Sequence, residues 1–185
     1  TIQETATNDS YLLTDGEPRA FEIRTDGLVV TADAEGGELA FYNQVVRNDL
    51  KLSKKAADTN ASLQVPFAIT NVATGETHVL VTDRNGQAST EASWNKHTLN
   101  TNGNDHLLEA EAITSEMMDP SAGIWFGLGE DGSTAPANDA LAALPFGQYM
   151  LEELPCEANE GYELVTKTFW IERDSGVAEA VWMTL

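Results

Sequence analysis

Cysteine is nearly absent from this sequence, which has only Cys156 among its 185 residues. A single cysteine excludes an intramolecular disulfide and a zinc site built from several cysteines. Secreted domains often depend on disulfides for stability, so a secreted domain of this composition would need another means of stabilisation. The thiol could be reactive if exposed or inert if buried. Hydrophobic residues make up 42% of the chain, which is enough to form a packed core.

Basic residues are scarce as well, because 10 lysines and arginines stand against 30 aspartates and glutamates, a formal net charge of -20. Nucleic-acid binding requires clustered positive charge that neutralises phosphates, and attraction to anionic lipid requires the same. We therefore expect no nucleic-acid partner and no docking on anionic membranes. The acidity itself indicates solubility and mutual repulsion rather than a specific partner.

Long apolar runs are also missing. No stretch of about 18 apolar residues, the length of a membrane-spanning helix, occurs in the chain. Residues 1–13 lack the basic start and the apolar run of a signal peptide, and the first residue is Thr1 rather than methionine. We therefore expect no membrane insertion by this chain, and we interpret it as a fragment of a longer protein.

Short apolar segments separated by Gly, Asp, Asn and Pro dominate what is present. Segments of this kind predict β-strands joined by tight turns. The expected strands are residues 11–14, 20–24, 28–33, 38–46, 49–55, 65–71, 77–83, 147–154, 162–173 and 177–185. Many short strands at this spacing are typical of an all-β sandwich.

A long polar segment, residues 84–146, interrupts this pattern and is rich in Gly, Asn and Asp. Apolar residues at helical spacing, with abundant Glu and Ala, predict a helix over 104–119. Asn138 or Asp139 would cap a second short helix over 137–144. Segments of this length inside a compact domain are usually functional or partly ordered excursions, so we expect an insertion that is the variable part of the domain and a candidate for ligand binding.

A weak internal repeat links the two ends of the chain. In each copy an acid, Glu4 or Glu153, is followed by a tyrosine, then by Phe-x-Ile with an acidic Gly turn, and then by an alternating apolar strand. This order predicts two similar sandwich domains in tandem. Residues 1–47 would be the C-terminal half of the first domain. Residues 48–185 would be the second domain, with the insertion at about 84–146.

Four motifs of the second domain share their order and spacing with one protein family. They are an apolar-x-apolar-x-Lys strand over 50–54, the strand VPFAIT over 65–70, the turn segment from TGE to DRNGQ over 74–87, and PFGQYMLEELP with the following Gly-Tyr over 145–162. Together they resemble the Cna B-type, SpaA-like domains of Gram-positive pilins and cell-surface adhesins. The resemblance implies an Ig-like or prealbumin-like β-sandwich with a long, partly helical insertion.

Domains of this family commonly form an internal isopeptide bond between a lysine and an asparagine, assisted by a buried acid. In the second domain the resemblance assigns Lys54 as the donor and Glu153 as the acid. In the first domain it assigns Asn43 as the acceptor and Glu4 as the acid, so Lys54 and Asn43 would belong to different bonds. The lysine partner of Asn43 would precede the chain. The acceptor for Lys54 would lie about two residues beyond Leu185, by the alternation of a strand.

The residue types suit this chemistry. A lysine amine is nucleophilic only when it is neutral, and burial disfavours its charged form. A carboxyl group among apolar neighbours is favoured in its protonated form and can donate a hydrogen bond to an amide oxygen. A packed core that holds amine and amide at reacting distance replaces a bimolecular encounter. Such a crosslink would also stabilise a domain that has no cysteine pairs.

Other interpretations of these residues stay open. Lys54 could be an ordinary lysine at a strand end, and a register shift of one residue would turn Lys55 inward instead. Glu153 shares the parity of Leu151, which places it inward, where an unpaired carboxyl group is costly. Asn43 could simply end a strand.

The resemblance implies a structural and adhesive module, a stalk or shaft domain of a pilin or another secreted protein anchored in the cell wall of a Gram-positive bacterium. Its partners would be the neighbouring tandem domains and, through the insertion, a host protein or a glycan. Exposed aromatic residues there would suit such a ligand, but we expect Trp94, Trp125 and Phe126 to be buried. We expect no cofactor and no enzyme activity apart from the autocatalytic crosslink.

The alternative is a metal-dependent enzyme or ligand-binding module with its site in residues 84–146. His97, His106, Asp105 or the Glu-rich helix predicted over 104–119 would supply that site, although the spacing matches no compact zinc motif. Such a site requires these side chains to converge on a pocket, whereas a stalk requires only the lysine, the acid and the acceptor in its core.

Overall fold

A computed structural model describes residues 1–24, 29–31 and 40–185 of the chain, with side chains for all of these except 29–31. The described residues form two compact units, Thr1–Val46 and Arg47–Leu185. The strands expected over 28–33 and 38–46 lie partly outside the described residues. No helix in the described ranges is long and apolar enough to cross a membrane.

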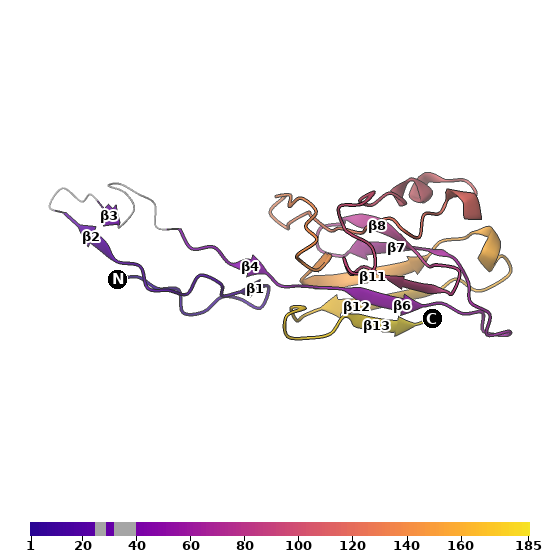
Figure 1. The fold of residues 1–185 in the computed structure, drawn as a ribbon, viewed down its shortest axis with the longest axis horizontal. Helices are drawn as coiled ribbons and strands as arrows, with labels where there is room; N and C mark the ends of the chain where they lie inside the picture. Colours follow the sequence, from indigo (N-terminus) through magenta and orange to yellow (C-terminus); the bar gives the residue numbers. More distant parts are fainter. Residues whose placement is uncertain (25–28, 32–39) are drawn as a thin grey trace. The chain divides into compact units, whose positions relative to one another are not determined.

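The described residues of the first unit form two small antiparallel strand pairs (Figure 1). β1 (Tyr11–Leu12) pairs with β4 (Gln44–Val45), and β2 (Phe21–Ile23) pairs with β3 (Val29–Thr31). Isolated pairs of this size bury little apolar surface. Several large apolar side chains of this unit are accordingly exposed, namely Ile2, Tyr11, Leu13, Phe21, Ile23 and Tyr42.

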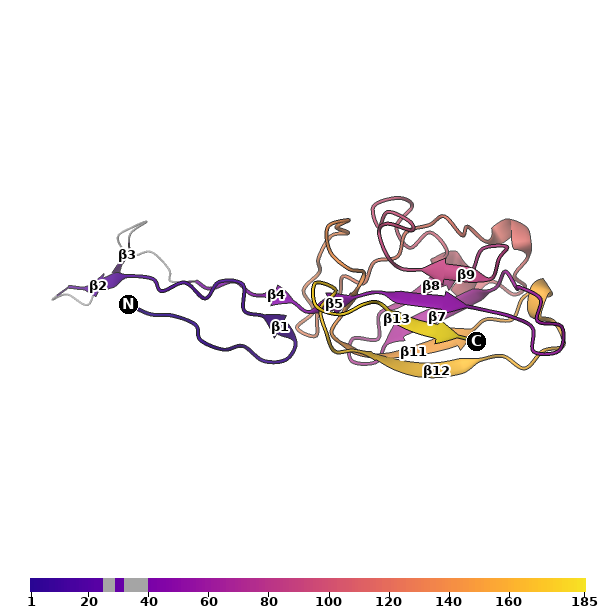
Figure 2. The same cartoon turned by 60° about the horizontal axis from the view of Figure 1, so that its bottom comes forward.

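The second unit is an all-β sandwich, which confirms the fold class predicted from the sequence. A four-stranded antiparallel sheet has the order β12-β11-β7-β8, and a three-stranded sheet has the order β13-β6-β9 (Figures 1 and 2). A separate two-stranded antiparallel sheet pairs β5 with β10. The strands are β5 (Arg47–Asn48), β6 (Leu50–Ser53), β7 (Pro66–Asn71), β8 (Thr77–Val81), β9 (Gln87–Ser89), β10 (Leu144–Pro145), β11 (Gly147–Glu153), β12 (Thr166–Ile171) and β13 (Val181–Thr184).

The core lies between the two sheets. Leu50 and Leu52 of β6 are fully buried, in keeping with the period-2 alternation of a strand. From the facing sheet, Tyr149 stacks on Phe169 with ring centroids 5.2 Å apart and meets the edge of Phe126 at 5.4 Å. Each such side chain stabilises the fold by roughly 1.5–3 kcal/mol when it is fully buried.

The last strand, β13, runs parallel to β6 (Figure 2). The register aligns Thr184 with Ser53. Pairing continues past the strand, because the Leu185 amide donates to the Ser53 carbonyl at 2.8 Å and the Lys55 amide donates to the Leu185 carbonyl at 3.0 Å. Leu185 therefore lies level with Lys54.

The segment between β9 and β10, residues 90–143, contains no α-helix, so the helix predicted over 104–119 is wrong. Two short 3₁₀ helices stand in its place, η1 (Asp105–Glu109) and η2 (Ser115–Met117). The Asn104 side chain donates to the carbonyl of Asp119 and accepts from its amide, both at 2.8 Å. A continuous α-helix would separate these two residues by about 22 Å, so this closure excludes it.

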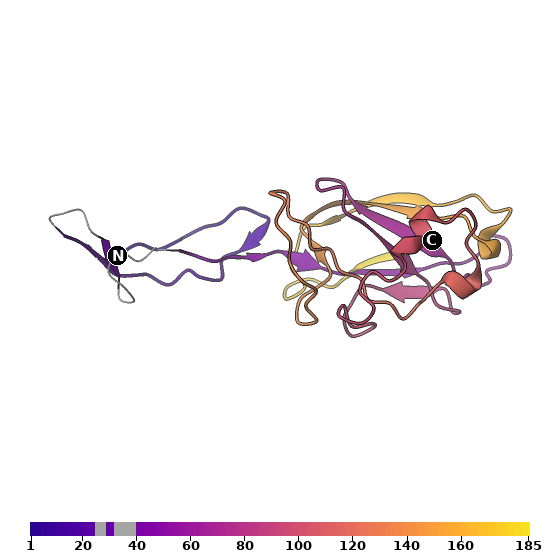
Figure 3. The same ribbon diagram turned by 90° about the horizontal axis from the view of Figure 1, so that it is seen from above.

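The second predicted helix, over 137–144, is also wrong. This stretch forms a turn and then enters β10, where Leu144 pairs with Asn48. The Asp49 carboxylate accepts from the Ala143 amide at 3.0 Å, which holds the end of the stretch extended. Local helix propensity is a weak preference that tertiary contacts of this kind override. Within the β9–β10 segment, η1 lies against β8, where the Asp105 carboxylate accepts from the Val79 amide at 3.0 Å (Figures 1 and 3).

Candidate functional site

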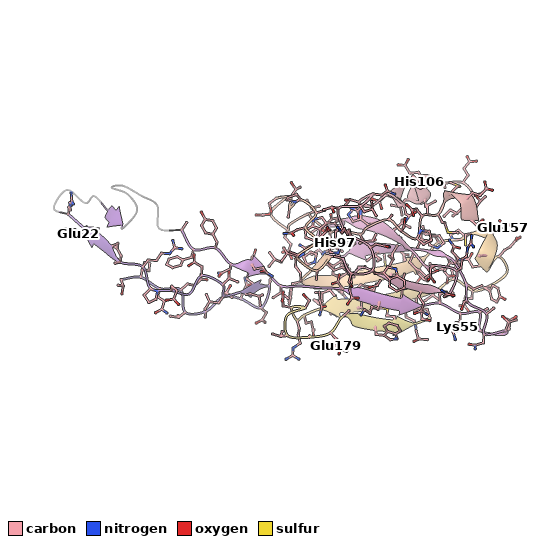
Figure 4. All side chains as sticks on the ribbon, viewed as in Figure 1. Glu22, Lys55, His97, His106, Glu157 and Glu179 are labelled. Carbon is pink, nitrogen blue, oxygen red and sulfur yellow. The ribbon has the colours of Figure 1, made fainter. Side chains whose placement is uncertain are left out.

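A buried ion pair joins the two sheets of the second unit. Lys54 follows β6 of the three-stranded sheet, Glu153 ends β11 of the four-stranded sheet, and Lys54 Nζ lies 2.9 Å from Glu153 Oε2. Lys54 is 5% exposed and Glu153 is 4% exposed. Lys55, which follows Lys54 in the chain, and Glu157, in the loop after β11, are labelled at the same end of the sandwich in Figure 4. Two opposite charges thus face each other away from water.

The local backbone fixes which lysine faces inward. Lys54 shares the face of Leu50 and Leu52 and is buried, whereas Lys55 is exposed. The Lys54 amide donates to the Gly86 carbonyl at 2.7 Å, and Gly86 has a φ of 70°. A Cβ at position 86 would lie 2.3 Å from the Lys54 carbonyl oxygen, so only glycine permits this approach. Lys54 therefore faces the core, as the strand alternation predicts.

Three donors surround the Glu153 carboxylate. Lys54 Nζ and the Val165 amide donate to Oε2 at 2.9 and 3.1 Å, and Asn159 Nδ2 donates to Oε1 at 2.9 Å. Within the part of the chain that the structure describes, every buried side-chain nitrogen or oxygen has a hydrogen-bond partner. A buried charge requires such partners. The sequence did not reveal Asn159, because an asparagine in a loop after a strand carries no local signal of its partner.

A cleft of about 630 Å³ opens beside the ion pair. Its lining includes Lys54, Leu63, Val165, Lys167 and Leu185. The cleft therefore lies beside Lys54 and beside Leu185, the residue that follows β13.

In the first unit, Glu4 contacts Asn43. The Asn43 Nδ2 donates to both carboxylate oxygens of Glu4, at 2.8 and 2.9 Å, and both residues are partly buried. Residues 1–46 contain no lysine. The chain thus brings an acid together with an amide in the first unit, and an acid together with an amine in the second. Lys54 and Asn43 lie in different units.

A second charged cluster ties the β9–β10 segment to β8. His78 of β8 bonds Asp105 through Nδ1 at 2.8 Å and Glu76 through Nε2 at 3.1 Å. The Phe126 ring packs edge-on against the imidazole at 4.8 Å. Burial alone would lower the pKa of His78, but the hydrogen bonds with Asp105 and Glu76 raise it to about 9. The imidazole is therefore charged at neutral pH, between two carboxylates.

Raising the pH is expected to weaken this anchor. The pKa of His78 is about 9 in the folded chain, against an ordinary value of 6.5. Its contribution to stability is therefore complete below about pH 6.5 and is lost as the pH rises through about 9. The full contribution is about 3 kcal/mol. Urea unfolding of the wild type and of His78→Gln, from about pH 6 to about pH 10, measures it.

The difference in free energy of unfolding between the two proteins should shrink as the pH rises from about 6.5 to about 9, and it should be small above that. His106→Gln is the control, because His106 is exposed and its removal should give a small difference at every pH. A difference between wild type and His78→Gln that does not change with pH would show that the imidazole is not held as a cation.

The residues predicted for a metal or enzyme site do not converge. Asp105 bonds His78 rather than His97 or His106. His97 is fully buried between two backbone carbonyl groups, and His106 is exposed (Figure 4). Among the described residues, no group of three or more His, Cys, Asp or Glu side chains is placed to hold a metal ion. The geometry therefore gives the alternative site no assembled set of ligands.

The aromatic residues of the β9–β10 segment divide into two groups. Trp125 and Phe126 are buried, as expected, but the expectation is wrong for Trp94, which is 47% exposed. Trp94 belongs to a turn in which its amide donates to the Glu91 carbonyl at 2.9 Å. That short turn leaves the indole at the surface.

Cys156 is buried, and burial raises the pKa of its thiol, which favours the inert form.

A third buried cluster forms around Arg47. Its guanidinium donates at 2.6 Å to each of three backbone carbonyl groups, those of Phe126, Ala142 and Ala143. The guanidinium also lies 3.9 Å from the ring centre of Trp125. Burial lowers the pKa of Arg47 to about 10, so it is charged at neutral pH. This arginine therefore ties the β9–β10 segment to β5.

No known protein family matches this sequence, and no curated protein does either. Among solved structures, the Bacillus anthracis TIE protein is similar, with a TM-score of 0.49 and 18% sequence identity. The similarity covers 99% of this chain and 23% of that chain, so this chain spans less than a quarter of that protein's length. Function must therefore be inferred from the residues of the chain itself.

Proposed function

We propose that this chain is part of the stalk or shaft of an extracellular, wall-anchored surface protein or pilin of a Gram-positive bacterium. In this proposal an autocatalytic isopeptide bond from Lys54 stabilises the second unit. The observation that carries the proposal is the buried contact of Lys54 Nζ with Glu153 Oε2 at 2.9 Å. Apolar residues often stabilise a core as well as or better than a buried ion pair. An amine and an acid kept together in a core therefore favour a reaction that needs both.

The reaction would link Lys54 to a side-chain carboxamide. Glu153 accepts a proton from the Lys54 ammonium group, which leaves a neutral amine. The amine attacks the carboxamide carbon while protonated Glu153 donates a hydrogen bond to the carboxamide oxygen. The bond to the original amide nitrogen then breaks, and this nitrogen takes one proton from the attacking amine and the proton held by Glu153, so that it leaves as ammonium. The new amide remains, the carboxylate is regenerated, and the balance needs no oxidant, reductant or cofactor.

We expect the acceptor on the continuation of β13. Leu185 lies level with Lys54, and every second residue of a strand shares one face. An asparagine at the second position after Leu185 would therefore face the cleft beside Lys54. In the first unit, Glu4 and Asn43 would react in the same way with a lysine on a preceding strand.

Ligand contact would belong to the β9–β10 segment. Trp94, Leu99 and Leu108 are 47%, 56% and 43% exposed there. The segment is anchored to the sandwich through Arg47 and His78, and loops on a rigid scaffold commonly carry recognition. We propose a host protein or a glycan as the ligand, and the neighbouring tandem domains as structural partners.

The intact mass of a chain extended past both ends tests the crosslink. We expect this chain to be lighter than its sequence by one ammonia for each unit. Glu153→Ala and Lys54→Met should each restore one ammonia, whereas Lys55→Met, at the exposed neighbouring position, should restore none. Peptide mapping should then find Lys54 joined to the acceptor. An extended chain with its full calculated mass would overturn the proposal.

A further inference from the structure

A buried asparagine contacts the same carboxylate as Lys54. Asn159 ends η3 (Glu157–Asn159), in the loop that follows β11, and is 2% exposed. Its Nδ2 donates to Glu153 Oε1 at 2.9 Å and to the Leu154 carbonyl at 3.0 Å. Its Oδ1 accepts from the Cys156 amide at 2.8 Å. Both polar atoms of the Asn159 side chain therefore form hydrogen bonds, and one of the two bonds donated by Nδ2 goes to Glu153.

The orientation of this amide is determined by its neighbours. A flip of the Asn159 side chain would place Oδ1 against two acceptors, the Leu154 carbonyl and the Glu153 carboxylate. It would also place the amide NH₂ group against the Cys156 N–H. Since donors do not bond donors and acceptors do not bond acceptors, only the observed orientation satisfies the site.

The consequence is that the two oxygens of Glu153 have different surroundings. Oε1 is held by Asn159, so Oε2 is the oxygen that faces Lys54 and the Val165 amide. The terminal torsion of a glutamate is otherwise broad and roughly two-fold. Asn159 is also neutral, so it donates a hydrogen bond without competing with Lys54 as the cation of this carboxylate.

Asn159 also separates the ion pair from solvent. It lines a groove of about 620 Å³ together with Ile113, Cys156 and Tyr162. Truncation of its side chain would connect this groove with the Glu153 carboxylate. Water would then compete with Lys54 for the carboxylate oxygens.

We propose that Asn159 is a positioning residue for the crosslinking reaction. It holds Glu153 Oε1, so that Glu153 Oε2 stays in contact with Lys54 Nζ. In this position Oε2 takes the proton of the ammonium group, and the protonated carboxyl group can then donate a hydrogen bond to the acceptor amide. This inference rests on the proposed function, because it assigns a role in that reaction. Small displacements of a reacting group cost about 100-fold in rate, so we expect loss of Asn159 to slow crosslinking by about 10- to 100-fold.

The rate is measured on the chain extended beyond Leu185. Cell-free synthesis is stopped, samples are quenched in acid over time, and ammonia loss is followed by intact mass. Asn159→Ala is compared with Asn104→Ala. Asn104 is a matched control because it is also 2% exposed and also closes a loop through backbone bonds, but it does not touch Glu153. We expect Asn159→Ala to be slow and Asn104→Ala to react at the wild-type rate.

A second readout does not depend on the crosslink. In the 185-residue chain, the protons of the Lys54 ammonium group should exchange slowly with water, as measured by NMR, and Asn159→Ala should speed this exchange at least about tenfold.

An unchanged crosslinking rate or an unchanged exchange rate in Asn159→Ala would overturn the positioning role. If the extended wild type keeps its full mass, the proposed function fails, while the exchange rate still decides whether Asn159 holds the pair. Ammonia loss from the 185-residue chain that Asn159→Ala abolishes would make Asn159 the acceptor and overturn its role as a positioning residue.

Discussion

Replacing Glu153 with alanine is expected to lower the free energy of unfolding of the second unit by about 3–5 kcal/mol, even in a chain without the crosslink. The Lys54 ammonium, only 5% exposed, would then lie in the core without a counter-charge. The Val165 amide and the Asn159 side chain would lose an acceptor as well. Urea unfolding of the 185-residue chain and of the Glu153→Ala variant measures this loss.

Two further variants separate the ion pair from its surroundings. Lys54→Met combined with Glu153→Leu removes both charges, so it should cost much less than Glu153→Ala, because no unpaired charge remains in the core. Glu152→Ala, at the neighbouring position on the opposite face of β11, should change the free energy of unfolding by less than about 0.5 kcal/mol. If Glu153→Ala cost no more than Glu152→Ala, the buried contact would not be part of the stable fold.

Replacing Arg47 with methionine is expected to cost about 3 kcal/mol or more. Methionine preserves much of the apolar stem but leaves three buried carbonyl groups without their donor. Each lost bond to a charged group in the interior is worth about 1.5–3 kcal/mol, and part of this loss is recovered if water enters. The indole of Trp125 would also lose the cation 3.9 Å from its ring centre. Urea unfolding gives the total cost.

Hydrogen exchange locates the effect of this substitution. The amide of Ala143, whose carbonyl accepts from Arg47, donates to Asp49. It should exchange faster in Arg47→Met, whereas the amides of β7 should remain protected. Arg47→Lys should not restore protection, because an ammonium group cannot reach three carbonyl groups in the geometry of a guanidinium. Arg84→Met, in an exposed turn, is the control. Unchanged exchange at Ala143 would contradict the view that Arg47 anchors the β9–β10 segment.

Strand alternation predicted the inward side chains of the sandwich because it is a local property of the sequence. The parity of Leu50, Leu52 and Lys54 along one strand favoured the lysine in the core over Lys55, and the parity of Leu151 favoured the same for Glu153; the structure buries both. That Glu153 is the residue that faces Lys54 across the core could be predicted only from the family resemblance, because the two residues are 99 positions apart in the sequence.

The β9–β10 segment was not predictable in the same way. Its local composition favours helix, but its conformation is set by polar side chains that bond distant backbone groups. Asn104 closes on Asp119, and Arg47 reaches Ala143 across 96 positions of sequence. The partners of His78 and Asn159 were likewise invisible, because a hydrogen bond between loops leaves no periodic pattern.

Tension applied along the chain would act on β6 and β13 as a sliding force. Because the two strands are parallel neighbours, pulling Arg47 and Leu185 apart strains all of their ladder hydrogen bonds at once rather than one after another. If a bond joined Lys54 to a residue just beyond Leu185, the applied force would be transmitted along residues 47–54 and then through the crosslink. Residues 55–185, including the whole β9–β10 segment, would then keep their shape while the protein is stretched.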